Sequence, residues 1–185
     1  MLSISSLDVA YGQSQVLWGV DLEVRAGELV CLMGRNGVGK TTLLKTTIGL
    51  LPARGGRVMF DGSDITTWSP DRRARAGVGY VPQGREIFPH LSVEENLRMA
   101  LLGCGRTASL DEPTEGIQPS IILEIEEALR RIKAELKLAV LLVEQYLDFA
   151  ERLADKYVIM SKGAVVASGE TRNLKIEMVR QHLAV

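Results

Sequence analysis

The sequence predicts an α/β fold, in which helices cover a mainly parallel sheet and an antiparallel β layer comes first in the chain. Short apolar runs typical of strands alternate with helical patterns from residue 29 onward, and several of these runs are apolar on both faces, as buried parallel strands are. Glycines are spread among many turns, without a low-complexity linker or an internal repeat. The 185 residues therefore predict one domain, 1–185, with a sizeable core.

Strands are expected where an apolar run is bounded by turn residues. The first two runs, 2–9 and 16–24, are separated by the turn Tyr-Gly-Gln-Ser at 11–14 and form the expected antiparallel layer. The other expected strands cover residues 29–33, 57–60, 79–81, 139–144, 157–160 and 164–167. Helical spacing predicts helices over residues 39–50, 92–101, 120–136, 145–154 and 173–183.

The predicted helix over 120–136 has the clearest pattern. Apolar residues recur at steps of three and four and form one stripe: Ile122, Ile125, Leu129, Ile132 and Leu136. The charged residues between them are expected to face solvent: Glu124, Glu126, Glu127, Arg130, Arg131 and Lys133. Ser120 is expected to cap the first turn, after Pro119 ends the preceding loop.

Charge and composition exclude several classes of function. Lys and Arg number 22 and Asp and Glu 23, a net charge of −1, so binding to nucleic acid through a basic surface is disfavoured. The longest apolar stretch, 138–143, is far shorter than the roughly 18 residues that cross a bilayer. The first residues lack the basic and apolar regions of an export signal, so we expect neither a membrane span nor export.

The two cysteines, Cys31 and Cys104, have no second pair with which to build a metal cluster. Cys31 lies in an apolar run, which indicates a small buried residue and not a nucleophile. A reduced, cytosolic compartment is the simpler interpretation of this cysteine usage.

A phosphate-binding loop is predicted between the strand 29–33 and the following helix. Residues 34–41, Gly-Arg-Asn-Gly-Val-Gly-Lys-Thr, fit the spacing G-x-x-x-x-G-K-[ST] in the required order of strand, loop and helix. Glycines let backbone N–H groups approach phosphates, and a helix N-terminus adds partial positive charge. Lys40 can reach the β- and γ-phosphates, and the Thr41 hydroxyl is placed to bind Mg²⁺. The candidate nucleotide-binding residues of the loop are Gly34, Asn36, Gly37, Gly39, Lys40, Thr41 and Thr42.

Two adjacent carboxylates, Asp111 and Glu112, precede Pro113 and are expected at the end of a strand. In enzymes with a phosphate loop, one such carboxylate supports Mg²⁺ and the next can polarise the attacking water. Acidic residues before a proline are also typical of a simple turn. The catalytic interpretation of the two carboxylates is therefore supported only in combination with the phosphate loop.

These motifs, taken in order, resemble those of the ATP-binding subunit of an ATP-binding-cassette transporter over almost the whole chain. Asp111 resembles the aspartate that supports Mg²⁺, and Glu112 resembles the general base. Gln83, in Tyr-Val-Pro-Gln, resembles the glutamine that touches Mg²⁺ and the water and couples to the membrane subunits. Tyr11 resembles the aromatic residue that stacks on adenine, with a plain turn aromatic as the alternative. Residues 116–119 resemble the segment that meets the partner subunit.

Four runs are similar to the branch that serves branched-chain amino-acid and urea importers: Gly-Arg-Glu-Ile-Phe-Pro at 84–89, Ser-Val-Glu-Glu-Asn-Leu at 92–97, residues 114–119 and Leu-Val-Glu-Gln at 142–145. The resemblance implies a P-loop NTPase core that binds ATP and Mg²⁺ and couples hydrolysis to uptake of urea or branched-chain amino acids. The implied partners are transmembrane permease subunits and a second ATP-binding subunit, in a homodimer or heterodimer, without nucleic acid. The implied location is peripheral, at the cytoplasmic face of the inner membrane of a bacterial cell.

The chain departs from this family at two places. Gln145 stands where most of the wider family has a histidine near the γ-phosphate, and an amide can donate a hydrogen bond but cannot carry a proton as imidazole does. The sequence also contains no Leu-Ser-Gly-Gly-Gln-like signature, the segment that in the family closes the phosphate loop of the other subunit. Only 28 positions (111 − 83) separate Gln83 from Asp111, so the helical subdomain is expected to be largely absent.

The shortening is placed between about residues 102 and 109. Residues 106–110, Arg-Thr-Ala-Ser-Leu, lack the apolar run of a central strand, so a damaged strand and displaced carboxylates are expected. A natural deletion, an engineered join and an error in the recorded sequence are all compatible with this junction. The competing functions are an ATP-hydrolysing motor subunit and an ATP-binding module without turnover. A GTPase or small-molecule kinase is disfavoured, because no Asn-Lys-x-Asp guanine motif occurs and no acceptor-binding lid can be recognised.

Other conspicuous residues have plain structural interpretations. A solvated helix face is expected for three arginines: Arg72, Arg73 and Arg75. Packing near the antiparallel layer is expected for both tryptophans, Trp18 and Trp68. A surface position is expected for both histidines, His90 and His182.

Overall fold

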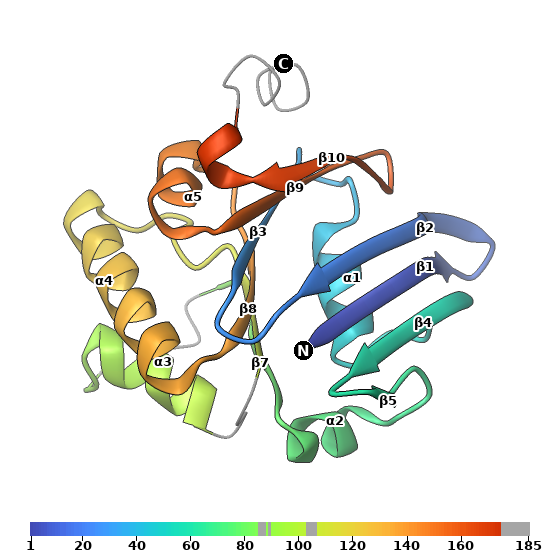
Figure 1. Cartoon of the computed structure of the whole chain (residues 1–185), viewed down its shortest axis with the longest axis horizontal. Helices are drawn as coiled ribbons and strands as arrows, with labels where there is room; N and C mark the ends of the chain where they lie inside the picture. The colour runs from blue at the N-terminus through green and yellow to red at the C-terminus, as the bar shows by residue number, and fades with distance from the viewer. Residues whose placement is uncertain (85–87, 89, 103–106, 175–185) are drawn as a thin grey trace.

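The computed structural model describes residues 1–84, 88, 90–102 and 107–174, which form two sheets and the helices packed on them (Figure 1). The first sheet is antiparallel, in the order β2-β1-β4-β5. The second has the order β10-β9-β3-β8-β7-β6, and all its neighbours are parallel except β10 and β9. The predicted α/β fold with an antiparallel β layer is therefore confirmed.

Most elements begin and end close to their predicted limits. The strands are β1 Leu2–Tyr11, β2 Ser14–Val24, β3 Leu29–Met33, β4 Gly55–Phe60, β5 Ser63–Asp64, β6 Val78–Val81, β7 Thr107–Asp111, β8 Ala139–Val143, β9 Lys156–Ser161 and β10 Ala164–Glu170. The helices are α1 Lys40–Thr47, α2 Pro70–Ala76, α3 Val93–Leu102, α4 Pro119–Leu136 and α5 Leu147–Leu153, with one 3₁₀ turn, η1 Thr171–Asn173. Most of the predicted helix 173–183, with His182, lies outside the described residues.

The central strands are apolar on both faces because a separate hydrophobic core covers each face. Val30 and Leu32 of β3 belong to the core shared with α1 and the antiparallel sheet, whereas Cys31 and Met33 belong to the core shared with α4 and α5. Figure 1 shows this division, with α3, α4 and α5 on one side of the large sheet. Cys31 is fully buried as expected, and burial strongly raises the pKa of its thiol, as expected of an inert residue.

Strand β7 corrects the expectation of a damaged strand before Asp111. All five of its residues are buried, and β7 pairs in parallel with β6 on one side and β8 on the other. The Thr107 hydroxyl donates to the carbonyl of Ala139 at 2.6 Å, while Ala108 and Leu110 point into the core beneath α4. Apolarity is a poor guide here, because two neighbouring strands supply the backbone partners and a β-branched threonine fits the pleated surface.

Helix α4 corrects three expectations. It begins at Pro119, whose fixed φ suits the first helical position, so Ser120 lies inside the helix and no side chain caps its start. The stripe is buried at Ile125, Leu129 and Ile132, but Leu136 is exposed. Glu126 is buried and not solvent-facing, because it bonds Arg130 at 2.7 Å and Arg152 of α5 at 2.8 Å.

Two of the other structural interpretations are wrong. The Arg73 side chain is buried instead of solvated, because four carbonyls from two separate segments, the end of α1 and the loop before α2, surround its guanidinium. Trp18 is exposed, because its neighbours Leu17 and Val20 take the inward positions of β2. Trp68 packs against the core and His90 is exposed, as predicted.

Between β6 and β7, the described part of the chain contains one helix, α3, which packs against α4. Arg98 of α3 links the two helices through Glu135 at 2.6 Å. Residues 103–106, the predicted junction, lie outside the described residues. No helix in the described part of the chain has the length and hydrophobicity that crossing a bilayer requires.

Candidate functional site

The predicted phosphate loop connects β3, in the middle of the large sheet, to α1. Gly39 precedes the helix with a φ of 107°, a left-handed conformation that L side chains rarely adopt. A Cβ there would also lie 2.6 Å from Leu17 Cδ2 of the antiparallel sheet. Glycine is therefore required where β2 approaches the start of α1, and this approach leaves the backbone N–H groups of the helix N-terminus turned toward the loop.

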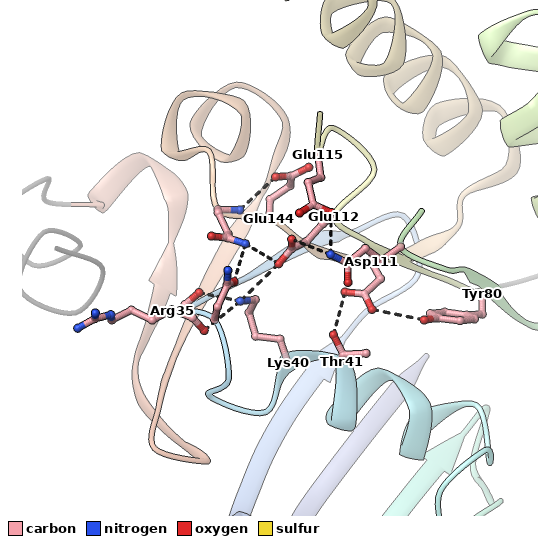
Figure 2. Close-up of polar contacts among 12 residues, drawn as sticks. Arg35, Lys40, Thr41, Tyr80, Asp111, Glu112, Glu115 and Glu144 are labelled. Atoms are coloured by element: carbon pink, nitrogen blue, oxygen red, sulfur yellow. Dashed lines mark hydrogen bonds and ion pairs between the residues drawn. The ribbon is translucent and has the colours of Figure 1, made fainter. Parts of the chain in front are cut away.

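Lys40, the first residue of α1, is buried and turned back over the loop. Its Nζ donates to the carbonyl of Gly34 at 2.8 Å and to that of Arg35 at 3.1 Å. The same nitrogen lies 3.5 Å from Oε1 of Glu112, a residue brought from the end of β7 (Figure 2). The lysine of the loop and the candidate base therefore face one another across the site.

Asp111, the last residue of β7, lies between two hydroxyl groups (Figure 2). Thr41 Oγ1 donates to its Oδ1 at 3.5 Å, and the Tyr80 hydroxyl donates to its Oδ2 at 3.4 Å. Burial, with a contribution from the charge of Glu112, raises the pKa of the Asp111 carboxyl, and the two hydroxyl groups oppose that rise. A threonine hydroxyl beside a carboxylate is a hard-oxygen donor pair that fits Mg²⁺, which prefers one or two carboxylates together with phosphate and water ligands. The described residues contain no cluster of three acidic, histidine or cysteine ligands.

Glu112 sits at the centre of the polar contacts. Its backbone has a φ of 48°, an uncommon left-handed conformation for a residue with a side chain. Its N–H donates to the carbonyl of Val143 at 3.0 Å, and its Oε1 accepts from Gln145 Nε2 at 2.8 Å. Gln83 Nε2 lies 3.5 Å from Oε2. Together with Lys40, these contacts place the carboxylate among residues that follow three different strands: β3, β6 and β8.

The two glutamines bind other loops as well. Gln145 Nε2 also donates to Asn36 Oδ1 at 2.8 Å, which ties the loop after β8 to the phosphate loop. Gln83 Nε2 donates to Glu115 Oε2 at 2.7 Å, which ties the loop after β6 to the turn after β7. The Gln145 amide therefore links Glu112 to the phosphate loop, and the Gln83 amide links Glu112 to Glu115.

These residues enclose a hollow of about 270 Å³, lined by residues 36, 37 and 39–42 together with Val16, Gln83 and Glu112. The structure thus brings together nearly all the predicted site residues. Because β7 is intact, the damaged strand from which a displacement of Asp111 and Glu112 was expected is not present. Gly34, Asp111 and Gln145 do not line the hollow themselves but bond residues that do. Tyr11 ends β1 with an exposed ring and does not line the hollow.

Two larger hollows, of about 490 and 610 Å³, lie elsewhere. The first runs between the two sheets past Lys156, and the second lies beside Asp155 and Thr171. Neither is lined by a residue of the phosphate loop or by the first turn of an α-helix. The smaller hollow is therefore the better candidate for phosphate chemistry.

Sequence reasoning missed two residues of the site, Tyr80 and Glu144. Tyr80 immediately precedes the Val-Pro-Gln run and contacts Asp111. Glu144 is a nearly fully buried carboxylate between Val143 and Gln145. The available signal was its position, since it is an acidic residue at the end of a strand that is otherwise apolar.

The chain is similar to known proteins in both sequence and fold. A profile of the ABC transporter family matches residues 17–181. The chain is 27% identical to the probable branched-chain amino acid transport ATP-binding protein LivF of Archaeoglobus fulgidus, covering 94% of each chain. It is 30% identical to the high-affinity branched-chain amino acid transport ATP-binding protein BraG of Pseudomonas aeruginosa, covering 90% of this chain and 91% of the relative.

Among solved structures, a nucleotide-free ATP-binding cassette from an ABC transporter superimposes with a TM-score of 0.83 over 100% of this chain and 95% of the other. The sequence identity is 21%, so this similarity concerns the fold. The agreement extends to the mixed arrangement of an antiparallel sheet beside a mostly parallel one.

In the alignments with both branched-chain relatives, this chain has gaps where the relatives have residues. The alignment with the A. fulgidus protein has 221 positions, whereas 94% of 185 residues is about 174, so about 47 positions of the relative have no counterpart here. With the P. aeruginosa protein, 213 positions contain about 167 residues of this chain, which leaves about 46. The aligned region of this chain is therefore internally shorter than both relatives by nearly the same number of residues.

Proposed function

Because the chain belongs to the ABC transporter family, we propose that it binds Mg-ATP in the hollow beside residues 36–42 and serves as the ATP-hydrolysing subunit of an importer. ATP-binding subunits of this family are ATPases that form dimers and work with transmembrane permease subunits. One observation carries the proposal: Lys40, Thr41 and Glu112 line one hollow at the start of α1. Asp111 bonds Thr41 and Gln145 bonds Glu112 beside it.

The nucleotide is proposed to lie with its phosphates over the N-terminus of α1. Lys40 exchanges its bonds to the carbonyls of Gly34 and Arg35 for bonds to the β- and γ-phosphates, which are stronger because both partners are charged. Thr42 adds a hydroxyl at the same helix end. Adenine is expected on the exposed ring of Tyr11.

Thr41, Asp111 and Gln83 are the residues proposed to hold Mg²⁺. Thr41 and Asp111 already present oxygens 3.5 Å apart beside the loop. When bound, Mg²⁺ would neutralise charge on the β- and γ-phosphate oxygens. The position of Asp111 between two hydroxyl groups fixes the direction of its carboxylate before any ligand arrives.

In the proposed reaction, a water oxygen forms a bond to the γ-phosphorus and the bond from that phosphorus to the oxygen bridging the β-phosphorus breaks. Glu112 accepts the proton that the water loses, and ADP and inorganic phosphate leave. Gln145 donates an amide hydrogen bond to the γ-phosphate. Since Gln145 contacts Glu112 at 2.8 Å, the base and the γ-phosphate sensor are held together.

We expect this chain alone to turn over ATP slowly. Phosphoryl transfer depends on positioning and on stabilising charge across the γ-phosphate, and the sequence lacks the signature segment whose donors close the site of the other subunit. The internal shortening by about 46 or 47 residues relative to two relatives supports this loss. The same observation favours a second candidate function, an ATP-binding module without turnover.

The cargo class is proposed from the branch that the chain resembles. Two relatives carry names for branched-chain amino acid transport, and branched-chain amino acids or urea are the proposed cargo. The permease subunits are proposed to hold the chain at the cytoplasmic face of the membrane. The purified chain is accordingly expected not to sediment with protein-free liposomes.

Steady-state phosphate release, measured together with light scattering in the presence and absence of Mg-ATP, separates the two candidates. We expect bound ATP, little ATP-dependent dimerisation and release at least about 100-fold slower than by the intact P. aeruginosa relative, because losing one preorganised donor to transition-state charge costs about 10²–10³-fold. In that relative, the variant matching Glu112→Gln is expected to trap ATP, because a positioned base contributes about 10²–10⁴-fold. Turnover at the relative's rate with ATP-dependent dimerisation would overturn the expected slowness, and failure to bind ATP would overturn both candidates.

A further inference from the structure

Glu144 is a buried carboxylate whose contacts join two loops of the site. Its Oε1 accepts from the backbone N–H of Thr114 at 3.1 Å and from the Thr114 hydroxyl at 2.6 Å. Its Oε2 accepts from the backbone N–H of Gln145 at 3.1 Å. Thr114 itself is fully buried, so neither side of this contact is exposed to water.

The two joined loops carry the proposed base and the proposed γ-phosphate sensor. Thr114 belongs to the turn after β7, two residues beyond Glu112, and that turn is closed by bonds from Glu115 N–H to the carbonyl of Glu112 and from Ile117 N–H to the carbonyl of Thr114. Gln145 lies in the loop after β8, directly after Glu144. Figure 2 draws Glu144 in the same group of polar contacts as Glu112, with Thr41 at the other end of the group in this view.

Burying the Glu144 carboxylate costs free energy of folding, which argues against a purely structural role. Burial raises the pKa of the Glu144 carboxyl, and hydrogen bonds from Thr114, Gln145 and Tyr146 only oppose that rise. A neutral residue would end an apolar strand at lower cost, because a buried carboxylate loses its hydration. A charged acceptor, in contrast, can hold several donors from two loops in one fixed geometry.

The backbone conformation of Glu112 is the feature that contacts from neighbouring residues need to fix. Its left-handed conformation is unfavourable for a side-chain-bearing residue and persists only where surrounding contacts fix it. The bonds from Thr114 to Glu144 fix the residues that directly follow. Glu112 also lies 2.8 Å from Gln145, whose backbone N–H is a further donor to Glu144.

We propose that Glu144 is a positioning residue, whose buried carboxylate ties Thr114 to the backbone of Gln145 and so holds Glu112 and Gln145 in register for the γ-phosphate. The inference rests on the function proposed above, because it assigns the γ-phosphate to Gln145. Glu144 touches neither nucleotide nor water in this role. It acts through the two loops that it joins.

Two variants remove the tie without removing volume. Thr114→Val loses the hydroxyl donor, and Glu144→Gln loses the charge and one acceptor. Thr114→Ser keeps the hydroxyl and is the rescue variant. Thr107→Val is the matched control, since it removes an equally buried threonine hydroxyl bond, at 2.6 Å, at the opposite end of β7 from the site.

Two measurements distinguish positioning from mere stability. The side-chain amide resonance of Gln145, assigned by its loss in Gln145→Met, is expected to shift in Thr114→Val and Glu144→Gln but not in Thr107→Val or Thr114→Ser. Calorimetry is expected to show ATP affinity about 3- to 10-fold weaker in the first two variants with ADP affinity changed less than about 2-fold, as loss of one hydrogen bond predicts.

The outcomes separate this inference from the function on which it rests. An unmoved Gln145 resonance in both variants, or equal effects of Thr114→Val and Thr107→Val on every readout, would overturn the positioning role. Equal losses of ATP and ADP affinity would also overturn it. If the wild type bound neither nucleotide, the proposed function would fail, while the resonance test would still decide whether Glu144 positions Gln145.

Discussion

The buried guanidinium of Arg73 offers a sharp test of how the C-terminal end of α1, the helix that follows the phosphate loop, is held. Its Nη1 donates to the carbonyls of Thr46 and Thr47 at 2.7 Å each, its Nη2 to that of Thr66 at 2.7 Å and its Nε to that of Trp68 at 3.1 Å. The first two carbonyls end α1, where a positive charge also meets the negative end of the helix dipole. Burial lowers the pKa of the Arg73 guanidinium, which nevertheless stays charged at neutral pH.

Arg73→Met is expected to lower the free energy of unfolding by about 3–5 kcal/mol. Hydrogen bonds to a charged group contribute about 1.5–3 kcal/mol each, but Thr46 O keeps a second donor in the N–H of Gly49, and the removed charge no longer has to be buried. For a chain of this length, 1 kcal/mol shifts Tm by roughly 2–4 °C, so a decrease of about 6–20 °C is expected. Arg73→Lys keeps the charge but not the planar fork, and an intermediate loss is expected.

Arg75→Met is the matched control on the same helix. Arg75 is exposed and pairs only with Asp71 among the ion pairs of the described residues, so its loss is expected to cost about 0–1 kcal/mol. Urea unfolding followed by circular dichroism measures both variants. The reasoning would be refuted if the two variants differed by less than about 1 kcal/mol.

Three further predictions concern the nucleotide, a loop contact and a titration. Tyr11→Ala should weaken ATP and ADP binding alike by roughly 0.5–1.5 kcal/mol in calorimetry, and a loss confined to ATP would contradict stacking on adenine. Gly163→Ala should lower the free energy of unfolding by roughly 1–3 kcal/mol, because a Cβ at φ 82° would lie 2.0 Å from the carbonyl of Val16; an unchanged urea midpoint would disprove this. Burial raises the native pKa of Asp111 above its ordinary value of 3.8, so its favourable contribution to stability is complete below that value and is lost as pH rises through the native pKa. Asp111→Asn should therefore exceed the wild type in Tm at pH 8 by more than at pH 4, without Mg²⁺, and a gap that widens as pH falls would contradict the sign.

Local patterns predicted the central part of the fold because they record short-range constraints. The apolar strand, the glycines and the following helix of the phosphate loop lie within 19 residues (29–47), and their order alone positions Lys40 and Thr41. The carboxylates were predicted at a strand end, and the carboxyl ends of parallel strands meet at one edge of a sheet. The same topology brings Gln145 and Gln83 to that edge.

Long-range contacts decided the features that the sequence did not predict. Arg73 is buried by carbonyls of residues 46, 47, 66 and 68, which no local pattern brings together. β7 was expected to be damaged because its composition is polar, yet Thr107 finds a backbone acceptor in β8. Glu144 was not noticed because its partner Thr114 lies 30 positions away in the sequence.

Calorimetric titration of Mg-ATP into the wild type, Lys40→Ala and Lys45→Ala tests the central claim most directly. Both lysines belong to α1, but Lys40 is buried beside Glu112, whereas Lys45 lies in the last turn of the helix. The account predicts that the wild type and Lys45→Ala bind with similar affinity, and that Lys40→Ala binds about 10- to 100-fold more weakly, because the phosphates lose a charged donor. Equal affinity of the wild type and Lys40→Ala would contradict the assignment of the phosphate site.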